Sequence, residues 1–409
     1  MSSDSSKPRA RSHPGQPKVL LELIGRLRPH WRADSALPAR IERVLRSDRR
    51  RGASDRRLYR ELIYTALRHL PWVEPLIDGD PGRAAKAIAW LAAETPSTAA
   101  FRAAVAGDWP EVPADLAGRA AFLGTVPAEI LPAWFREHCP GVFAPAELDA
   151  QARRAPLWLR LQADRPGPVI DELLGKGWAI RRPEVLDTAV QVLGEADITA
   201  TEAFRSGRLE IQDIGSQLVL EAADPAPGGR WLDACAGAGG KALQLARMLG
   251  PEGTVDAYDI RPAALEELRH RSARAGARTI RVLEAPPSGR YDGVLVDAPC
   301  SGSGTWRRSP HLKWCTGPAD IGRWATRQTG LLGRFAGLVA PGGTLVYATC
   351  SLSRLENEAV VSDFLESHPG FAPRMIRSGL GFAERGGGHL LLPSVHDSDG
   401  FFVAVLGMD

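Results

Sequence analysis

The sequence predicts an α/β protein whose C-terminal part, residues 226–409, forms a doubly wound, mostly parallel sheet, preceded by a small α+β region and an all-helical region. Two patterns lead to this prediction. Beyond residue 226, short apolar runs rich in β-branched residues alternate with segments of helical periodicity, as in sheets covered by helices on both faces. Before about residue 145, apolar residues recur at helical spacing and are interrupted by proline and glycine.

Composition places the chain among globular proteins with several domains. Of its 409 residues, 44% are hydrophobic and 24% are charged, with a formal net charge of +3, which are ordinary values. Residues 1–17, rich in Ser, Pro, Lys and Arg, predict a disordered leader, and the apolar runs fall short of a membrane span. Five cysteines without Cys-x-x-Cys spacing argue against a disulfide framework and against a metal site. We therefore expect a cytoplasmic protein that binds neither membrane nor metal. The sequence leaves the oligomeric state open, and a monomer is the default expectation.

The helical region, residues 18–145, contains a basic cluster. Nine arginines fall between Arg40 and Arg60, against only Glu42, Asp48 and Asp55. Guanidinium groups pair with phosphates, so this cluster could hold a nucleic-acid backbone. A solvated helical face is an equally good interpretation of the same residues.

The remaining elements follow in order along the chain. In the α+β region, residues 150–225, strand-like runs at 157–161 and 209–213 flank a helix at 169–174. A proline- and glycine-rich stretch, Asp224–Gly229, predicts a linker. Beyond it we expect strands at 230–233, 254–259, 293–297, 344–349 and 401–406, and helices at 241–249, 262–275 and 320–338.

A glycine-rich turn, Asp233-Ala-Cys-Ala-Gly-Ala-Gly-Gly-Lys241, follows the first of these strands and opens a helix. Such turns let the backbone approach a ligand closely. Ala242 stands where a dinucleotide fingerprint needs glycine and where a P-loop needs Ser or Thr. Asp259, at the end of the second strand, could accept hydrogen bonds from ribose hydroxyls. S-adenosylmethionine, an adenosine ligand without a pyrophosphate, fits best; the alternative is a tight turn with no ligand.

Two cysteines follow neighbouring strand-like runs. Cys300 comes shortly after the run 293–297, and Cys350 comes directly after the run 344–349. Ligands of open α/β sheets bind at such strand ends. Two thiols on one rim could therefore face a single substrate, one as nucleophile and the other assisting. The competing interpretation is a pair of small buried hydrophobic residues.

Four motifs stand out along the C-terminal part: Asp233–Lys241, Asp297–Thr305, Arg307–Trp314 and Thr349–Glu358. Together they resemble the RsmB/NOL/Sun-type RNA (cytosine-5)-methyltransferase family. The resemblance is strong from about residue 207 to the C-terminus and moderate over residues 156–207. Around residues 55–77 it extends weakly to that family's NusB-like RNA-binding domain. It implies a class I, Rossmann-like methyltransferase domain over residues 226–409, an RNA-binding α+β subdomain, S-adenosylmethionine as cofactor, and RNA, above all ribosomal RNA, as substrate.

The resemblance also implies roles for individual residues. Cys350 would be the nucleophile that adds to carbon 6 of cytosine, and Cys300 would assist loss of the carbon 5 proton and product release. Asp297 would hydrogen-bond the ring of the base. Cofactor contacts are implied for Cys235, Ala236, Gly237, Ala238, Gly239, Gly240, Lys241, Asp259 and Asp297.

Three basic residues after the Cys300 motif carry implied RNA contacts. These are Arg307, Arg308 and Lys313, with Trp314 packing nearby. The alternative is a loop over the sheet whose cations are salt-bridged or solvated. A target base would have to leave any stack to reach the two cysteines.

The chain departs from the family pattern at the cofactor site. Ala264 stands where the family has an arginine, and Pro286 stands where it has an acidic residue that meets adenine. Glu284 could substitute for that acid only in a shifted register. These departures motivate a second hypothesis, a non-catalytic RNA-binding or ribosome assembly factor with a degenerate cofactor site. A third hypothesis is a methyltransferase that acts on a protein or a small molecule.

Overall fold

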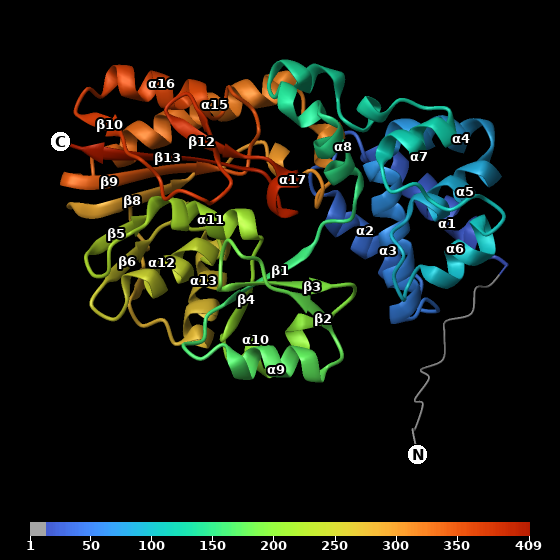
Figure 1. The fold of residues 1–409 in the computed structure, drawn as a ribbon, viewed down its shortest axis with the longest axis horizontal. Coiled ribbons are helices and arrows are strands. Elements are labelled where there is room, and N and C mark those ends of the chain that lie inside the picture. The colour runs from blue at the N-terminus through green and yellow to red at the C-terminus, as the bar shows by residue number, and fades with distance from the viewer. Residues whose placement is uncertain (1–13) are drawn as a thin grey trace. The chain divides into compact units, whose positions relative to one another are not determined.

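The computed structural model describes residues 14–409, which divide into two units (Figure 1). The first contains the chain up to Arg154 together with the later segment Trp306–Gly317, and the second contains Ala155–Thr305 and Pro318–Asp409. Most of the predicted leader, residues 1–13, lies outside the described residues. Its last two residues are helical instead, because the first helix begins at Gln16 with a proline in its first turn.

The first unit is helical, as the sequence predicts. Each helix buries an apolar face, and in the first helix Leu20, Leu23, Ile24 and Leu27 form that face. The helices are α1 (Gln16–Leu27), α2 (Leu37–Arg46), α3 (Ala53–Arg68), α4 (Leu70–Gly79), α5 (Pro81–Leu91), α6 (Ala99–Ala106), α7 (Leu116–Leu123), α8 (Pro145–Ala152) and α14 (Leu312–Cys315). Short 3-10 turns occur at Arg28–His30, Pro127–Ile130, Ala133–Glu137 and Pro140–Phe143.

The segment Trp306–Gly317 contributes α14 and two tryptophans to this unit. Trp306 is fully buried, and its ring centroid lies 4.5 Å from that of Phe135. The indole nitrogen of Trp314 donates a hydrogen bond of 2.7 Å to the carbonyl of Leu67. The sequence-based boundaries place this segment in the C-terminal domain, so its return to the helical unit is a finding of the structure.

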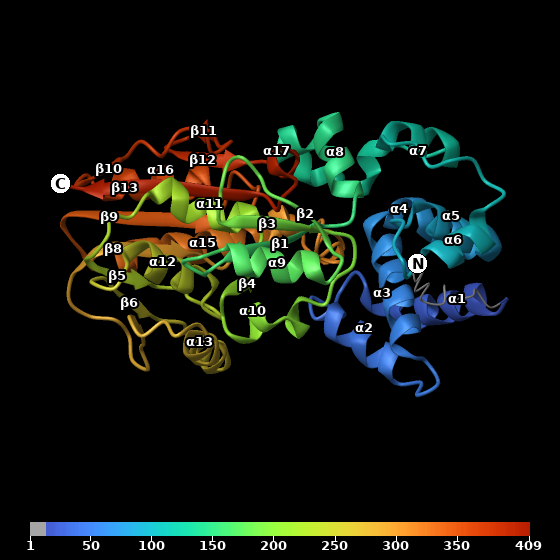
Figure 2. The same cartoon turned by 60° about the horizontal axis from the view of Figure 1, so that its bottom comes forward.

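A small antiparallel sheet opens the second unit (Figures 1 and 2). Its four strands lie in the order β2-β3-β1-β4, and Leu159, Val190 and Leu209 are fully buried in its core. The strands are β1 (Leu157–Leu161), β2 (Ala179–Arg181), β3 (Ala189–Leu193) and β4 (Leu209–Ile211). Two helices belong to the same region, α9 (Gly167–Gly175) and the short α10 (Glu202–Arg205), with a 3-10 turn at Ile198–Ala200.

The larger sheet has nine strands, eight of them in the order β11-β12-β13-β9-β8-β5-β6-β7, while β10 pairs with β13. Five strands pair in parallel: β5 (Arg230–Asp233), β6 (Thr254–Ala257), β7 (Ile280–Val282), β8 (Tyr291–Asp297) and β9 (Val339–Thr349). The others pair antiparallel: β10 (Phe371–Pro373), β11 (Ala383–Arg385), β12 (Gly388–Leu391) and β13 (Phe401–Met408).

Helices cover both faces of this sheet, so the predicted doubly wound α/β class is confirmed (Figure 1). One face carries α11 (Ile214–Ala223), α12 (Gly240–Leu249) and α13 (Pro262–Ala275). The other carries α15 (Pro318–Ala336) and α16 (Glu358–Ser367), and the short elements are α17 (Pro393–His396) and a 3-10 turn at Ser303–Thr305.

The interior of the larger sheet is closely packed. Gly293 on β8 has to be glycine, because a Cβ there would lie 2.2 Å from the ring of Trp231 on the neighbouring strand. Among residues 14–409, none of the helices combines the length and the apolar character that a membrane crossing requires.

Candidate active site

The two predicted cysteines meet at one edge of the larger sheet. Cys300 lies just beyond β8 and Cys350 directly follows β9, and these strands are parallel neighbours in which Asp297 pairs with Ala348. Parallel strands bring their carboxyl ends to the same edge. The two sulfur atoms lie 3.3 Å apart, within hydrogen-bond distance, and both residues are half-buried cysteines with free thiols.

Cys300 holds its proton firmly. The hydrogen bond to Cys350, together with burial of the sulfur from water, raises the pKa of Cys300 well above its usual range. Losing this proton would place a negative charge beside the second sulfur. Cys300 is therefore a neutral thiol, and either sulfur can be the donor in the contact between them.

A buried carboxylate, Glu356, ties together the loops that carry the cysteines. It is 0% exposed and accepts hydrogen bonds from the amide of Ser301 (2.8 Å), the hydroxyl of Ser301 (2.6 Å), the hydroxyl of Ser351 (2.5 Å) and the amide nitrogen of Gln328 on α15 (3.0 Å). Ser301 and Ser351 are the residues that follow the two cysteines. Glu356 lies inside the Thr349–Glu358 motif, but nothing in the sequence itself indicates its role.

Further short contacts fix the same two loops. The side chain of Asn357 accepts from the hydroxyl of Thr349 (2.6 Å) and donates to the carbonyl of Ser351 (2.9 Å). The amide of Gly304 donates to the carbonyl of Cys350 (2.9 Å), and a Cβ at this glycine would lie 2.1 Å from the carbonyl oxygen of Gly400. The cysteine loops are therefore held by hydrogen bonds on several sides.

The glycine-rich turn lies at the start of α12. Gly237 and Gly239 have φ angles of 54° and 84°, which favour glycine, and a Cβ at Gly239 would lie 2.7 Å from the side chain of Leu268. Burial raises the pKa of Cys235 to about 12, so this third cysteine stays a neutral thiol. The turn thus has the tight backbone that the sequence predicts for a ligand-binding loop.

Asp259 reaches this turn from the end of β6. Its carboxylate accepts a hydrogen bond from the amide of Gly237 (2.9 Å) and pairs with the guanidinium of Arg261 through both oxygens (2.9 Å each). Burial alone would raise the pKa of Asp259, but the bonds from Arg261 and Gly237 outweigh it and lower the pKa. The carboxylate is therefore ionised, and its partner Arg261 has a side chain that is 67% exposed.

Lys241 connects the turn to the cysteine edge. Its ammonium nitrogen lies 2.8 Å from a carboxylate oxygen of Asp297 and donates to the hydroxyl of Ser216 at 3.0 Å. It also lies 5.1 Å from the ring centroid of Phe401. Because Asp297 ends β8, this ion pair joins the predicted cofactor turn to the strand that leads to Cys300.

Asp233, at the end of β5, is a buried carboxyl group that the sequence analysis left unassigned. It is 0% exposed, and neither oxygen has a hydrogen-bond partner of ordinary geometry among the described residues. Burial, reinforced by the negative charge of Asp297, raises the pKa of Asp233 to about 7, although Lys241 and the amide of Cys235 offset part of the rise. A positively charged ligand group would supply the missing partner.

Replacing Asp233 with asparagine is expected to make stability less dependent on pH. Folding raises the pKa of Asp233 from 3.8 to about 7, so the native protein holds this proton more tightly than the unfolded chain does. The stability that the proton confers is complete below about pH 4 and is lost as the pH rises through about 7. Across that window the variant should gain about 1.4 kcal/mol per pH unit relative to the wild type.

Urea unfolding of wild type and Asp233→Asn at several pH values measures this gain. Glu284→Gln is a suitable control, because the side chain of Glu284 is 86% exposed. A stability difference between wild type and Asp233→Asn that stays constant from about pH 5 to about pH 8 would contradict the explanation by burial.

Glu284, Pro286 and Ala264, where the chain departs from the family pattern, all lie on or near α13 and the loop after β7. Glu284 lies in the loop after β7, where its exposed carboxylate pairs with Arg269 on α13 at 3.0 Å, and Pro286 is exposed in the same loop. Ala264 lies in the first turn of α13. Arg261, three residues earlier in the chain, supplies a guanidinium to Asp259. The structure therefore provides an arginine partner for Asp259 that the motif comparison did not identify.

The structure corrects the expected RNA contact of Lys313. Lys313 is 1% exposed, and its ammonium group donates to the backbone carbonyls of Arg68 (3.0 Å) and Ile130 (2.9 Å), all within the helical unit. Burial lowers the pKa of Lys313 well below its usual range. A group enclosed in this way anchors the segment Trp306–Gly317 and is not available to an RNA strand.

The same correction applies to Arg307, whereas Arg308 is exposed. Arg307 is 2% exposed, and its guanidinium donates to the carbonyls of Arg153 (3.3 Å) and Arg154 (3.0 Å). Arg307 and Lys313 are buried because the segment Trp306–Gly317 packs into the helical unit. The sequence of this motif, with its three cations, does not indicate that packing. The alternative, a loop over the sheet, is also wrong, because Arg307 and Lys313 donate hydrogen bonds to carbonyls of the helical unit.

The basic cluster between Arg40 and Arg60 is partly neutralised by its own acids. Arg60 pairs with Glu42 at 2.5 Å and Arg50 pairs with Asp48 at 3.1 Å. Five arginines of the cluster are exposed, namely Arg43, Arg46, Arg49, Arg50 and Arg57. The cluster therefore combines ion-paired guanidinium groups with a basic surface.

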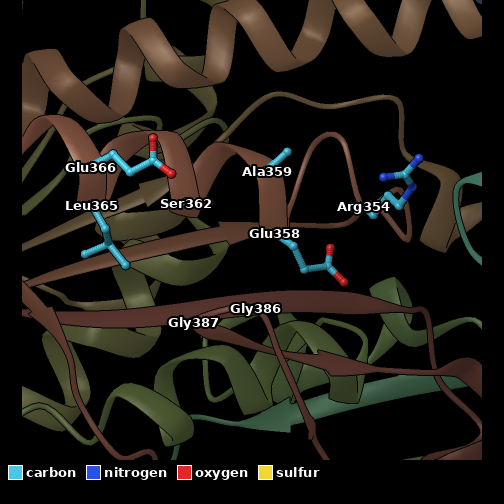
Figure 3. Close-up of a pocket in the computed structure, with 8 residues that line it drawn as sticks. All are labelled: Arg354, Glu358, Ala359, Ser362, Leu365, Glu366, Gly386 and Gly387. Atoms are coloured by element: carbon cyan, nitrogen blue, oxygen red, sulfur yellow. The ribbon is translucent and has the colours of Figure 1, made fainter.

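A hollow between α16 and the turn that joins β11 to β12 contains none of the predicted site residues (Figure 3). It is lined by Arg354, Glu358, Ala359, Ser362, Leu365, Glu366, Gly386 and Gly387. The candidate catalytic and cofactor-binding residues lie instead at the cysteine pair and the glycine-rich turn. Among residues 14–409, no cluster of three or more His, Cys, Asp or Glu side chains suits a metal ion.

Comparison with known proteins identifies relatives of this chain. A family model described as 16S rRNA methyltransferase RsmB/F matches residues 220–407. A probable ribosomal RNA small subunit methyltransferase B of Bacillus subtilis is 34% identical over 258 residues, which are 60% of this chain and 57% of that protein. The ribosomal RNA small subunit methyltransferase B of Xanthomonas campestris pv. campestris is 32% identical over 289 residues, which are 67% of this chain and 66% of that protein.

A solved structure shows the same fold. The methyltransferase homolog protein from Pyrococcus horikoshii is 26% identical, with a TM-score of 0.59, and the match covers 67% of this chain and 93% of that one. The chain spans between about half and two thirds of the length of the curated relatives it matches. Residues 220–407 of the chain are therefore similar in sequence to the RsmB/F methyltransferase family.

Proposed function

We propose that this protein is an S-adenosylmethionine-dependent RNA (cytosine-5)-methyltransferase and that ribosomal RNA is its substrate. The observation that carries the proposal is the pair of thiols, 3.3 Å apart, at the ends of two parallel strands beside the glycine-rich turn. The relatives named ribosomal RNA small subunit methyltransferase B support the choice of RNA. Such a substrate would place the reaction in the cytoplasm.

The residues at the turn fit S-adenosylmethionine on one observation. This ligand carries a sulfonium and an ammonium group, and the site offers three carboxyl groups, those of Asp233, Asp259 and Asp297. Asp233 is buried, and its oxygens have no hydrogen-bond partner of ordinary geometry among the described residues, so a cationic ligand group would offset the cost of its burial. The turn residues 235–241 would hold the ligand by their backbone, and Asp259 would accept from its ribose once Arg261 moves aside.

The cysteines would divide the chemistry between them. The thiolate of Cys350 adds to carbon 6 of a cytosine that has left its stack, and the electron pair displaced toward carbon 5 makes that carbon nucleophilic. Asp297 hydrogen-bonds the ring and stabilises the charge that develops there. S-adenosylmethionine, when bound, supplies the methyl group that carbon 5 takes up.

Release of the product would use the second thiol. Once the sulfur of Cys350 is bonded to carbon 6, it no longer holds the Cys300 proton, so the pKa of Cys300 falls and the proton passes to solvent. The Cys300 thiolate then takes the proton from carbon 5. The double bond re-forms, the bond between sulfur and carbon 6 breaks, and its electron pair returns to Cys350. Both thiols end in the state in which they began.

The proposal is tested by incubating the purified protein with ribosomal RNA and S-adenosylmethionine labelled in its methyl group. We expect label in 5-methylcytosine, and bisulfite sequencing of RNA from a deletion strain should lose the same position. Absence of transfer to any cellular RNA would overturn the assignment.

RNA is proposed to contact the exposed arginines between residues 40 and 60, Arg308, and the α+β subdomain, residues 150–225.

A second candidate is the RNA-binding or assembly factor without efficient cofactor binding. Two observations favour it. Pro286 and Ala264 replace the acidic residue and the arginine that the family has at the cofactor site, and the carboxylate of Asp259 is already paired with Arg261. Calorimetric titration with S-adenosylmethionine separates the two, because such a factor would show neither heat nor stabilisation by the ligand.

Replacing Cys300 with alanine is expected to trap a covalent protein–RNA adduct. The variant retains the nucleophile Cys350 but lacks the thiol that removes the carbon 5 proton, so the reaction stops after methyl transfer. A band of retarded mobility on a denaturing gel, formed only with RNA and cofactor, measures the adduct. Cys315→Ala, in the helical unit, is the control and should give no such band. If Cys300→Ala turned over at the wild-type rate, its role in release would be wrong.

A further inference from the structure

Two carbonyl groups of the glycine-rich turn are held by guanidinium groups. Arg160, on β1 of the small sheet, donates to the carbonyl of Gly240 at 2.8 Å. Arg271, on α13, donates to the carbonyl of Ala238 at 2.9 Å. The amide of Gly237 is engaged by Asp259. The conformation of the turn is therefore set by side chains that lie around it as well as by its own glycines.

The small sheet supplies the support for both guanidinium groups. Glu210 on β4 is the direct cross-strand partner of Arg160, and its two carboxylate oxygens pair with Arg271 (2.8 Å) and Arg274 (2.6 Å). Arg160 and Glu210 are 2% and 1% exposed. Two adjacent positions of this sheet thus control, directly and through α13, the two carbonyls of the turn.

Arg160 is held there at an energetic cost. Burial lowers the pKa of Arg160 to about 9, and its Nε and Nη2 atoms have no hydrogen-bond partner among the described residues. Its Nη1 atom, in contrast, bonds to Gly240, to the side-chain oxygen of Gln212 (2.5 Å) and to that of Gln244 (3.3 Å). An apolar side chain of similar size would fill the same space without this cost. We therefore attribute the presence of a cation here to its hydrogen bond with the carbonyl of Gly240.

A continuous set of hydrogen bonds leads from Arg160 to the cysteine edge. Gln212 bonds to the hydroxyl of Ser216 (3.2 Å), and that hydroxyl accepts from Lys241 (3.0 Å). Lys241 in turn pairs with Asp297 at 2.8 Å. The small sheet is therefore joined to both ends of the proposed site, the turn and the strand that precedes Cys300.

We propose that Arg160 and Glu210 are positioning residues that fix the carbonyls of the turn 237–240 and thereby preorganise it for the cofactor. The inference rests on the proposed function for the identity of that cofactor. It makes the small sheet a working part of the cofactor site, in addition to any contact that this sheet makes with RNA. A turn whose carbonyls are fixed away from the ligand needs no rearrangement on binding.

The test compares Arg160→Met, Arg160→Lys and Glu210→Gln with the wild type in the full chain. Amide hydrogen exchange in the ligand-free protein reads the order of the turn without any ligand. We expect faster exchange over residues 234–243 in Arg160→Met and Glu210→Gln, with partial recovery in Arg160→Lys. Arg181→Met is the matched control, because Arg181 lies on β2 of the same sheet and bonds to Gln191, not to the turn.

Calorimetric titration with S-adenosylmethionine gives the second readout. Loss of one hydrogen bond from a charged group should weaken binding by about tenfold or more and raise KM for the cofactor, with kcat at saturation little changed. Unchanged exchange in the turn of both Arg160→Met and Glu210→Gln would overturn the inference. If the wild type bound no S-adenosylmethionine, the proposed function would fail, while the exchange data would still decide the positioning role.

Discussion

Replacement of Cys350 with alanine is expected to reduce methyl transfer to RNA by at least about 10³-fold, because in the proposed mechanism covalent attack is the step that activates the base. Carbon 5 of cytosine is a weak nucleophile, and no other sulfur occupies the position of Cys350. Initial rates with labelled S-adenosylmethionine and ribosomal RNA, each at saturating concentration, measure the effect. The variant should form no covalent adduct with RNA.

Two comparisons show whether this loss is chemical. Cofactor affinity, measured by calorimetry, should be unchanged in Cys350→Ala, since the described contacts of the turn do not include this sulfur. Cys315→Ala should retain the wild-type rate, because Cys315 lies in the segment that belongs to the helical unit. A Cys350→Ala protein with a rate within about tenfold of the wild type would contradict the nucleophile assignment.

Replacement of Glu356 with alanine is expected to lower stability by about 3 kcal/mol or more, because it leaves several buried donors without an acceptor. The carboxylate accepts four hydrogen bonds from Ser301, Ser351 and Gln328, and the two serines directly follow the cysteines. Without it, the 3.3 Å contact between the sulfur atoms should be lost as well. The midpoint of thermal unfolding measures the first effect.

The second effect is measured as the alkylation rate of each cysteine, resolved by mass spectrometry. We expect Cys300 and Cys350 to react independently in Glu356→Ala, whereas in the wild type alkylation of one should alter the other. Glu358→Gln is the control, because Glu358 lies two residues further on, at the start of α16, whereas the hydroxyls of both serines donate to Glu356. Equal stability of Glu356→Ala and wild type would show that Glu356 does not organise these loops.

Four of the five parallel strands, β5, β6, β8 and β9, were predicted, because each lies in a short strand-like run close to a glycine or proline. The proximity of Cys300 and Cys350 followed from that prediction, since residues after neighbouring parallel strands share an edge. The parallel strand β7 and the antiparallel strands β10, β11 and β12 were not predicted. They have three or four residues each, so no period in the sequence distinguishes them from loops.

Burial of charged side chains explains both the wrong RNA assignments of Lys313 and Arg307 and the omission of Glu356 and Asp233. Lys313 and Arg307 were expected at an RNA surface because the family resemblance implies RNA contacts for them, and only the fold shows the carbonyls that accept their hydrogen bonds. Glu356 and Asp233 were passed over because an acid in a loop or at a strand end looks solvated in a sequence. Their importance depends on groups that are distant along the chain and adjacent only after folding.

The segment Trp306–Gly317 makes the two units inseparable by a single cut. A fragment beginning at Ala155 would still contain Lys313 and Arg307 but would lack the carbonyls to which they donate. Their uncompensated charges would draw this stretch into water, only a few residues beyond Cys300. For the same reason, an exchange of the helical unit of this chain for another one would have to include the segment Trp306–Gly317.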